Sequence, residues 1–278
     1  MSEQALAESP AFQYSTYFFQ ERASGAERSA AIILPFVWRY MTPKSAVDVG
    51  CGIGNWLNVC RRMGIERVLG IDGDYVNPDE LQIPRERFIP ADLTQPVRCE
   101  ERFDLAICLE VAEHLPESSA AILVDSLVRL ADVILFSAAI PGQTGTNHIN
   151  EQWPEYWAEA FSRHSYSAVD CLRDAVWNNQ FVEPWYAQNA MLFVKDARLR
   201  RDTRFRNARV VAVPQRRVHP KTFLNAYQRL EDLQALRSTP ECGWAFRALG
   251  LSLVRRARIR ERISRIIRGV RRRLFNCK

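Results

Sequence analysis

The stretch AVDVGCGIGNW, residues 46–56, decides the fold. Its β-branched start is typical of a buried strand, and glycines at 50, 52 and 54 separate that strand from a helix that we predict over 55–63. Glycine is favoured where the backbone must turn with a positive φ or where a ligand must approach it closely. A glycine loop alone is also compatible with a tight turn that binds nothing, so its surroundings must decide between the two.

Strands and helices alternate on both sides of this loop, which is typical of βαβ units joined into a parallel sheet. The predicted strands are residues 46–49, 67–71, 88–89, 103–109, 133–136, 166–171 and 185–195. The predicted helices are residues 23–40, 55–63, 116–131 and 154–162. Polar residues and Pro184 between the last two strands indicate that these strands close the sheet as an antiparallel pair. We therefore predict the α/β class, with a doubly wound, mostly parallel sheet of seven strands.

Acidic residues follow the ends of the predicted strands. Asp72 ends the strand after the glycine loop, and a carboxylate at this place can accept hydrogen bonds from both hydroxyls of a ribose. Asp92 follows the third strand in the same way. Each acid alone could be a solvated strand end, but the ordered set indicates a ligand that contains a ribose.

These motifs together resemble the class I S-adenosylmethionine-dependent methyltransferases. Residues 46–56 match the first motif of that family, Asp72 the second, residues 91–93 the third and FDLAICLEVAEHL at 103–115 the fourth, so the resemblance covers roughly residues 20–195. It implies a Rossmann-like methyltransferase fold, S-adenosylmethionine as cofactor and methyl transfer as the activity. The cofactor-binding residues that it implies are Asp48, Gly50, Cys51, Gly52, Gly54, Asp72, Gly73, Asp92, Leu93 and Glu110.

The resemblance also implies how these residues divide the cofactor among them. The glycines shape the loop against the methionine part, Asp72 holds the ribose, and Asp92 with the Leu93 amide contacts the adenine. The charges of the residues agree with this independently. A dinucleotide carries phosphates, which acids near the loop would repel, whereas a sulfonium is positively charged and suits a pocket walled by carboxylates. We therefore favour a methyltransferase over an NAD-binding oxidoreductase.

Histidines are the candidates for a catalytic base. Methyl transfer is an in-line displacement, so the enzyme mainly holds the reacting atoms in line, but an alcohol acceptor also benefits from a general base. His148 follows the predicted strand 133–136, at the edge where open α/β sheets bind ligands, and is the first choice. His114 is the second, although it can equally bond backbone at a helix start. The seven cysteines form no CxxC pair, which fits free thiols, and no metal site is predicted.

The polar loop at 142–153 is the predicted acceptor-binding segment, because its side chains can bond several hydroxyls of a sugar. Aromatic residues could supply apolar faces for the same acceptor, namely Trp153, Tyr156, Trp157, Trp177, Trp185 and Tyr186. A polar surface loop over an aromatic core remains an equal alternative. The strings HINEQWPEYWAEAF and EPWYAQNAMLFV also resemble methyltransferases that accompany bacterial glycan and surface-polysaccharide assembly. This implies O-methylation of a sugar or glycan hydroxyl. A soluble small-molecule acceptor, or a nucleic acid, stays open.

The net charge of +6 hides two opposed regions. Residues 1–196 carry 15 basic and 27 acidic side chains, a net charge of −12, whereas residues 197–278 carry 23 basic and 5 acidic, a net charge of +18. We predict an N-terminal helical cap over 1–45, a cofactor-binding methyltransferase domain over 46–196 and a basic α-helical extension, rich in arginine, over 197–278. The extension is predicted to hold one helix at 221–236 and a basic amphipathic helix at 244–275.

A basic amphipathic helix has several uses. Residues 244–278 could contact an anionic membrane surface or an acidic protein partner, or could pack with their arginines in solvent. A nucleic-acid partner is disfavoured, because the extension has few aromatic residues for stacking bases. The acidic start MSEQALAESP is unlike an export signal, and apolar runs fall short of the roughly 20 residues of a spanning helix. We expect a cytoplasmic protein, at the inner face of the membrane if the helix binds lipid.

Overall fold

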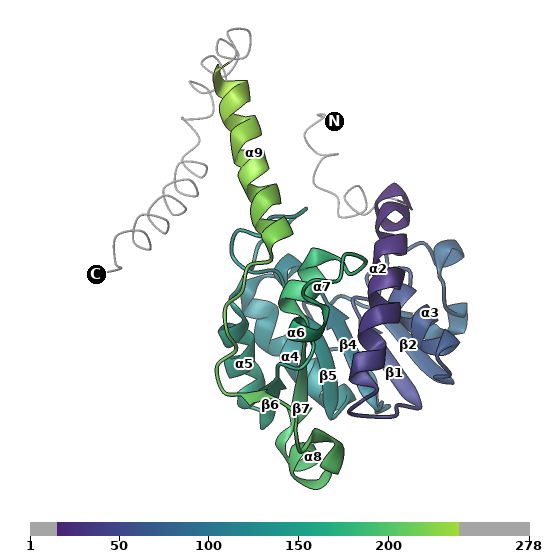
Figure 1. Cartoon of the computed structure of the whole chain (residues 1–278). Coiled ribbons are helices and arrows are strands. Elements are labelled where there is room, and N and C mark those ends of the chain that lie inside the picture. Colours follow the sequence, from purple (N-terminus) through teal and green to yellow (C-terminus); the bar gives the residue numbers. More distant parts are fainter. Residues whose placement is uncertain (1–15, 239–278) are drawn as a thin grey trace. The chain divides into compact units, whose positions relative to one another are not determined.

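The protein, described by a computed structural model over residues 16–238, is built around one mixed sheet of eight strands (Figure 1). The strands are β1 Ser45–Val49, β2 Arg67–Asp72, β3 Phe88–Pro90, β4 Leu105–Leu109, β5 Val133–Ser137, β6 Tyr166–Val169, β7 Met191–Lys195 and β8 Val210–Val211. Their order across the sheet is β3-β2-β1-β4-β5-β7-β6-β8. Strands β1 to β5 pair in parallel, whereas β7 runs antiparallel to both β5 and β6. The chain order reverses between β1 and β4, which is where open α/β sheets place their ligands.

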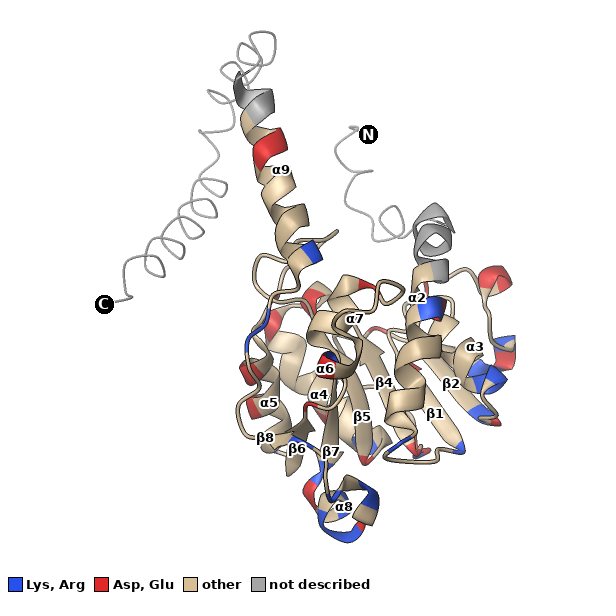
Figure 2. Ribbon diagram, viewed as in Figure 1, with Lys and Arg blue, Asp and Glu red and all other residues tan. Residues whose placement is uncertain are grey.

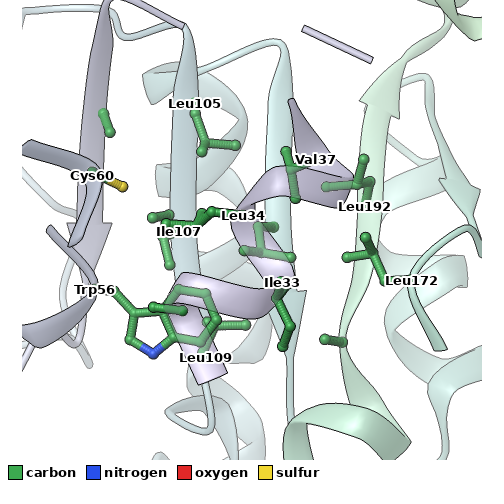
Figure 3. Packing of buried hydrophobic residues seen from close by; sticks show 14 of the residues in the cluster. Ile33, Leu34, Val37, Trp56, Cys60, Leu105, Ile107, Leu109, Leu172 and Leu192 are labelled. Carbon is green, nitrogen blue, oxygen red and sulfur yellow. The ribbon is translucent and has the colours of Figure 1, made fainter. Parts of the chain in front are cut away.

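Helices cover both faces of the sheet, so the core has two layers. Alternate residues of β4 show this: Leu105 and Ile107 pack with α2 (Thr16–Val37) and α3 (Asn55–Arg62), as Figure 3 shows from close by. Ala106 and Cys108, one residue along, pack on the other face with α4 (Ala120–Leu130) and α5 (Pro154–Ser162). This alternation follows from the two-residue period of a strand. The remaining helices are α6 Arg173–Val176, α7 Pro184–Asn189, α8 Asp196–Arg201 and α9 Pro220–Ser238.

The doubly wound α/β fold and the antiparallel closing pair are confirmed, with two corrections. The strand predicted over 185–195 begins only at Met191, and the residues before it form α7. Pro184 occupies the first turn of α7, where its missing N–H costs nothing, so the proline starts a helix there instead of separating two strands. The second correction is that the sheet has an eighth strand, β8, from the arginine-rich connection. The predicted helix at 221–236 is confirmed as α9.

The chain divides into two units, residues 1–223 and residues 224–278. The predicted basic helix at 244–275 lies outside the described residues, and the predicted domain boundaries and partners of residues 244–278 stay predictions. Within residues 16–238, none of the helices combines the length and the apolar character that crossing a lipid bilayer requires.

The arginine-rich connection after β7 pairs with acids of the sheet domain. Figure 2 colours the basic residues of α8 (Asp196–Arg201) blue on the ribbon. Further along, Arg209 and Arg217 both contact Asp174, and Arg216 contacts Glu155. These pairs are largely exposed, and such pairs contribute about 0–1 kcal/mol each. The basic charge of this segment is therefore partly compensated locally.

One ion pair in the same region is fully buried. Arg173 and Asp170 have side chains only 1% exposed, and the guanidinium donates two hydrogen bonds to the carboxylate, at 2.8 and 2.7 Å. A third N–H of Arg173 donates to the carbonyl of Gln215 at 2.9 Å. Asp170 directly follows β6, so the pair fastens the connection to the sheet.

Candidate functional site

The glycine loop between β1 and α3 is shaped by backbone angles that only glycine adopts easily. Gly50 has a φ of +82°, and a Cβ there would lie 2.2 Å from Cγ2 of Val111. Gly52 and Gly54 also have positive φ, and Gly54 caps the start of α3. The loop therefore brings bare backbone to the carboxyl edge of the sheet, beside the end of β4.

Asp72 organises the loop from the end of β2. Its Oδ2 accepts the N–H of Gly52 at 2.6 Å, and its Oδ1 accepts the N–H of Gly73 at 2.7 Å and the hydroxyl of Tyr75 at 2.5 Å. The side chain is almost fully buried, and this burial raises its pKa although the three hydrogen bonds oppose the rise. A carboxylate held on three donors is fixed in position.

A cavity of about 790 Å³ opens over these strand ends. This volume lies within the roughly 300–1,000 Å³ typical of small-molecule sites. Most of the residues predicted from the sequence line it: Gly50, Gly52, Asp72, Gly73, Asp92, Leu93, Glu110 and His114. The other lining residues include Ala26, Asp74, Tyr75, Thr94, Val111, Trp185 and Tyr186. The carboxyl ends of β1, β2, β3 and β4 thus contribute to one surface, as parallel strands require.

Three predicted cofactor residues lie behind that surface. Asp48 is only 3% exposed within β1, and Cys51 is buried in the loop with its thiol on the carbonyl of Gly52. Gly54 faces Ile83, whose side chain would lie 3.2 Å from a Cβ at this position. These residues do not line the cavity. They support the residues that do, from within the sheet and the glycine loop.

We expect Asp48→Asn to stabilise the protein at neutral pH by roughly 0.5–2 kcal/mol, the usual gain from a favourable single substitution. Burial, and then the charge of Asp72, raise the pKa of Asp48 well above its ordinary value. At a pH between the ordinary pKa of Asp48 in the unfolded chain and its raised pKa in the folded chain, the folded chain keeps a proton on Asp48 that the unfolded chain releases. The free energy of unfolding of the wild type therefore falls as the pH rises through that interval. Urea denaturation at acidic and neutral pH measures this. Asp79→Asn, at an exposed acid, should leave the urea concentration at the midpoint of unfolding unchanged at both pH values. A lower midpoint at neutral pH for Asp48→Asn than for the wild type would contradict the expectation.

Glu110 directly follows β4 and has a strained backbone conformation, with a φ of +55°. Its N–H donates to the carbonyl of Ser137, and its carboxylate accepts amide hydrogen bonds from Gln143 at 2.8 Å and Asn189 at 3.1 Å. Gln188 donates to Gln143 in turn, at 2.8 Å. Strain of this kind persists where surrounding contacts overdetermine it, which is common at functional sites. We call Glu110, Gln143, Gln188 and Asn189 the amide cluster.

The two histidines proposed as bases lie against each other. His114 lines the cavity, and its ring meets that of His148 edge to face with 4.9 Å between centroids. His148 does not line the cavity itself, and its side chain is 9% exposed. Its Nδ1 bonds to Oε1 of Glu151 at 3.0 Å. A carboxylate on one ring nitrogen fixes the tautomer and leaves Nε2 for chemistry.

Comparison with known proteins decides the class. A family model described as a methyltransferase domain matches residues 21–182. The chain belongs to this methyltransferase family. No curated protein matches the methyltransferase at a significant level.

The solved structures that are similar to this chain share little sequence identity with it. The methyltransferase is similar to human N-acetylserotonin methyltransferase in complex with S-adenosylmethionine, with 15% identity and a TM-score of 0.46 over 69% of this chain and 58% of the human enzyme. It is also similar to a putative O-methyltransferase from Nostoc punctiforme, with 14% identity and a TM-score of 0.46 over 63% and 56% of the two chains. A third similar structure is the methyltransferase domain of a bacterial Hen1 protein (CtHen1), with 18% identity and a TM-score of 0.45 over 61% of this chain and 97% of the Hen1 domain.

The lining of the cavity fits S-adenosylmethionine, which supplies a methyl group on a positively charged sulfur. The glycine loop offers backbone where a Cβ would collide, and carboxylates stand on the ends of neighbouring strands. Asp72 and Glu110 bring negative charge to the wall, which suits a cation. The amide cluster and the donors on Asp72 hold these carboxylates still, so the chain contributes position and charge to methyl transfer.

Sequence reasoning missed part of the site. Tyr75 fastens Asp72, and Ala26 of α2 lines the cavity from a segment that no motif covers. Trp185 and Tyr186, two of the aromatic residues predicted to face the acceptor, do line the cavity, but they do so from α7 and not from the predicted strand. An aromatic residue three positions after the acid was the available signal for Tyr75.

Proposed function

We propose that the methyltransferase transfers the methyl group to a hydroxyl of a sugar or glycan. The observation that carries the proposal is the chemistry beside the cofactor residues: two aromatic side chains, Trp185 and Tyr186, line the same cavity as Glu110 of the amide cluster. Aromatic rings present apolar faces, and amides both donate and accept hydrogen bonds. A sugar needs both, because its ring has apolar faces and its rim carries hydroxyls.

His148 is the proposed base for the hydroxyl proton, and His114 lies between it and the cavity. The bond to Glu151 orients His148 so that Nε2 can accept a proton. Burial by itself would raise the pKa of Glu151, but hydrogen bonds from His148 and from the backbone N–H groups of Gly142 and Thr144 outweigh it and hold that pKa below its ordinary value. An ionised Glu151 favours the protonated imidazole that would form.

The proposal is tested by incubating the chain with isotope-labelled S-adenosylmethionine and a panel of acceptors: oligosaccharides, nucleotide sugars, RNA oligonucleotides and phenols. We expect label in a sugar of the first two groups, at an oxygen identified by mass spectrometry. Transfer to RNA or phenols alone would reject a glycan acceptor and favour one of the alternatives.

His148→Ala should then lower turnover by about 10²–10⁴-fold, the usual contribution of a general base, and leave the affinity for S-adenosylmethionine unchanged. His164→Ala is the matched control. His164 also pairs with a carboxylate, that of Asp125 at 2.9 Å, but it is not one of the proposed site residues. Equal turnover in the two variants would remove His148 from the reaction.

A further inference from the structure

Glu113 and the two histidines form a cluster with the composition of a metal site. Glu113, His114 and His148 each offer one ligand atom, and these atoms all lie within 4.8 Å of one another. Metal ligands of these types lie about 2.0–2.2 Å from a bound ion, so two ligands of one ion are at most about 4.4 Å apart, which is close to the 4.8 Å that bounds this cluster. Glu113 and His114 are adjacent in the turn after β4, and His148 comes from the loop after β5.

Glu113 provides a second, independent observation. Its side chain is fully buried, and neither carboxylate oxygen has a hydrogen-bond partner among the described residues. A buried carboxylate without a partner is costly, and it is usually satisfied by a cation or by donors. The charge of the neighbouring Glu110 adds to this cost, which a bound cation would relieve.

The surroundings hold the three residues in place. The carbonyl of Glu113 accepts the N–H groups of Ile149 and Asn150, at 2.9 and 3.0 Å, which ties the loop that carries His148 to the turn that carries Glu113. Glu151 holds Nδ1 of His148, so Nε2 is the nitrogen available to a metal. A carboxylate behind a ligating histidine is the usual outer partner in metal sites.

We propose that Glu113, His114 and His148 bind one divalent transition-metal ion at the rim of the cofactor cavity. Two imidazoles and one carboxylate suit Mn²⁺, Fe²⁺, Co²⁺ or Zn²⁺ better than Mg²⁺, which prefers oxygen ligands. Three protein ligands leave positions open for an acceptor oxygen. His114 lines the cavity, so an acceptor oxygen bound there would lie beside the cofactor residues.

This inference rests on the proposed function only for the role of the ion. A bound metal would lower the pKa of a coordinated hydroxyl so that its proton is released to bulk water, and His148 would then hold the ion in place of accepting the proton itself. Both roles require His148, whereas only the metal requires Glu113. Variants of Glu113 therefore separate the two.

The test is a Mn²⁺ titration of the full, untagged chain after treatment with a chelator, followed by electron paramagnetic resonance of free Mn²⁺ and by calorimetry. We expect one ion per chain, at least tenfold weaker binding in Glu113→Gln and in His148→Asn, and about 10–100-fold weaker binding in Glu151→Gln, the usual effect of an outer partner. His164→Asn, at the other histidine–carboxylate pair, should bind like the wild type. Calorimetry with S-adenosylmethionine checks that each variant is folded.

The outcomes separate the metal site from the acceptor. Absence of Mn²⁺ binding, or binding that Glu113→Gln leaves unchanged, would overturn the metal site. Sugar methylation that persists in chelator would overturn the role of the ion in activating the acceptor, while the proposed function stands. Metal binding without methylation of any sugar would leave the site in place and reject the proposed acceptor.

Discussion

Replacing Asp72 with alanine should weaken the binding of S-adenosylmethionine by about 100-fold, because 1.4 kcal/mol corresponds to a factor of ten and hydrogen bonds to a charged group contribute about 1.5–3 kcal/mol each. The carboxylate accepts from Gly52, Gly73 and Tyr75, so its loss frees both the glycine loop and the turn after β2. It also removes a negative charge from the wall that faces the cofactor. Calorimetry measures the change directly.

Two controls distinguish loss of the carboxylate from general damage to the site. Asp74→Ala removes an exposed acid from the same cavity wall, two residues further on, and should change the affinity far less. Tyr75→Phe removes one of the three donors and should give an intermediate loss. If Asp72→Ala bound S-adenosylmethionine as well as Asp74→Ala does, the assignment of Asp72 to cofactor binding would be wrong.

Arg173→Ala should lower the free energy of unfolding by about 3–5 kcal/mol, the usual result of removing one partner from a buried ion pair. Asp170 would remain 1% exposed with its charge and without the two guanidinium hydrogen bonds. The carbonyl of Gln215 would lose its donor as well. Urea denaturation, with the site loaded and empty, measures the change.

The exposed pair Arg209–Asp174 provides the matched control, because it joins the same connection to the same region at 3.0 Å. Arg209→Ala should cost about 0–1 kcal/mol. The double variant Asp170→Leu with Arg173→Leu removes both charges and should be more stable than Arg173→Ala alone. Equal losses in Arg173→Ala and Arg209→Ala would show that burial adds nothing to this pair.

The cofactor half of the site could be predicted from the sequence because its residues stand at strand ends. Gly50, Asp72 and Glu110 stand at the carboxyl ends of β1, β2 and β4, which are parallel neighbours in the sheet, and such strands bring these positions to one edge whatever the details of packing. The sequence could also place the acids, since each follows a short apolar run. The local alternation of apolar runs, glycines and acids was therefore sufficient to predict the cofactor half of the site.

The proposed acceptor half depends on contacts that no local pattern contains. His114 and His148 were both singled out, but their contact and the buried Glu113 beside them arise from the way the loop after β5 folds back on the turn after β4. The sequence indicated no metal site because the three residues lack a fixed spacing. Trp185 and Tyr186 reach the cavity only because Pro184 starts a helix where a strand was predicted.

The two backbone hydrogen bonds on the carbonyl of Glu113 have a consequence for how the protein can diversify. They anchor the loop at Ile149 and Asn150, so the segment between Gln143 of the amide cluster and that anchor, residues 144–147, can change in composition while the turn after β4 and Glu110 keep their places. Exchange of this short segment between relatives should therefore redirect acceptor preference and leave methyl-donor affinity intact.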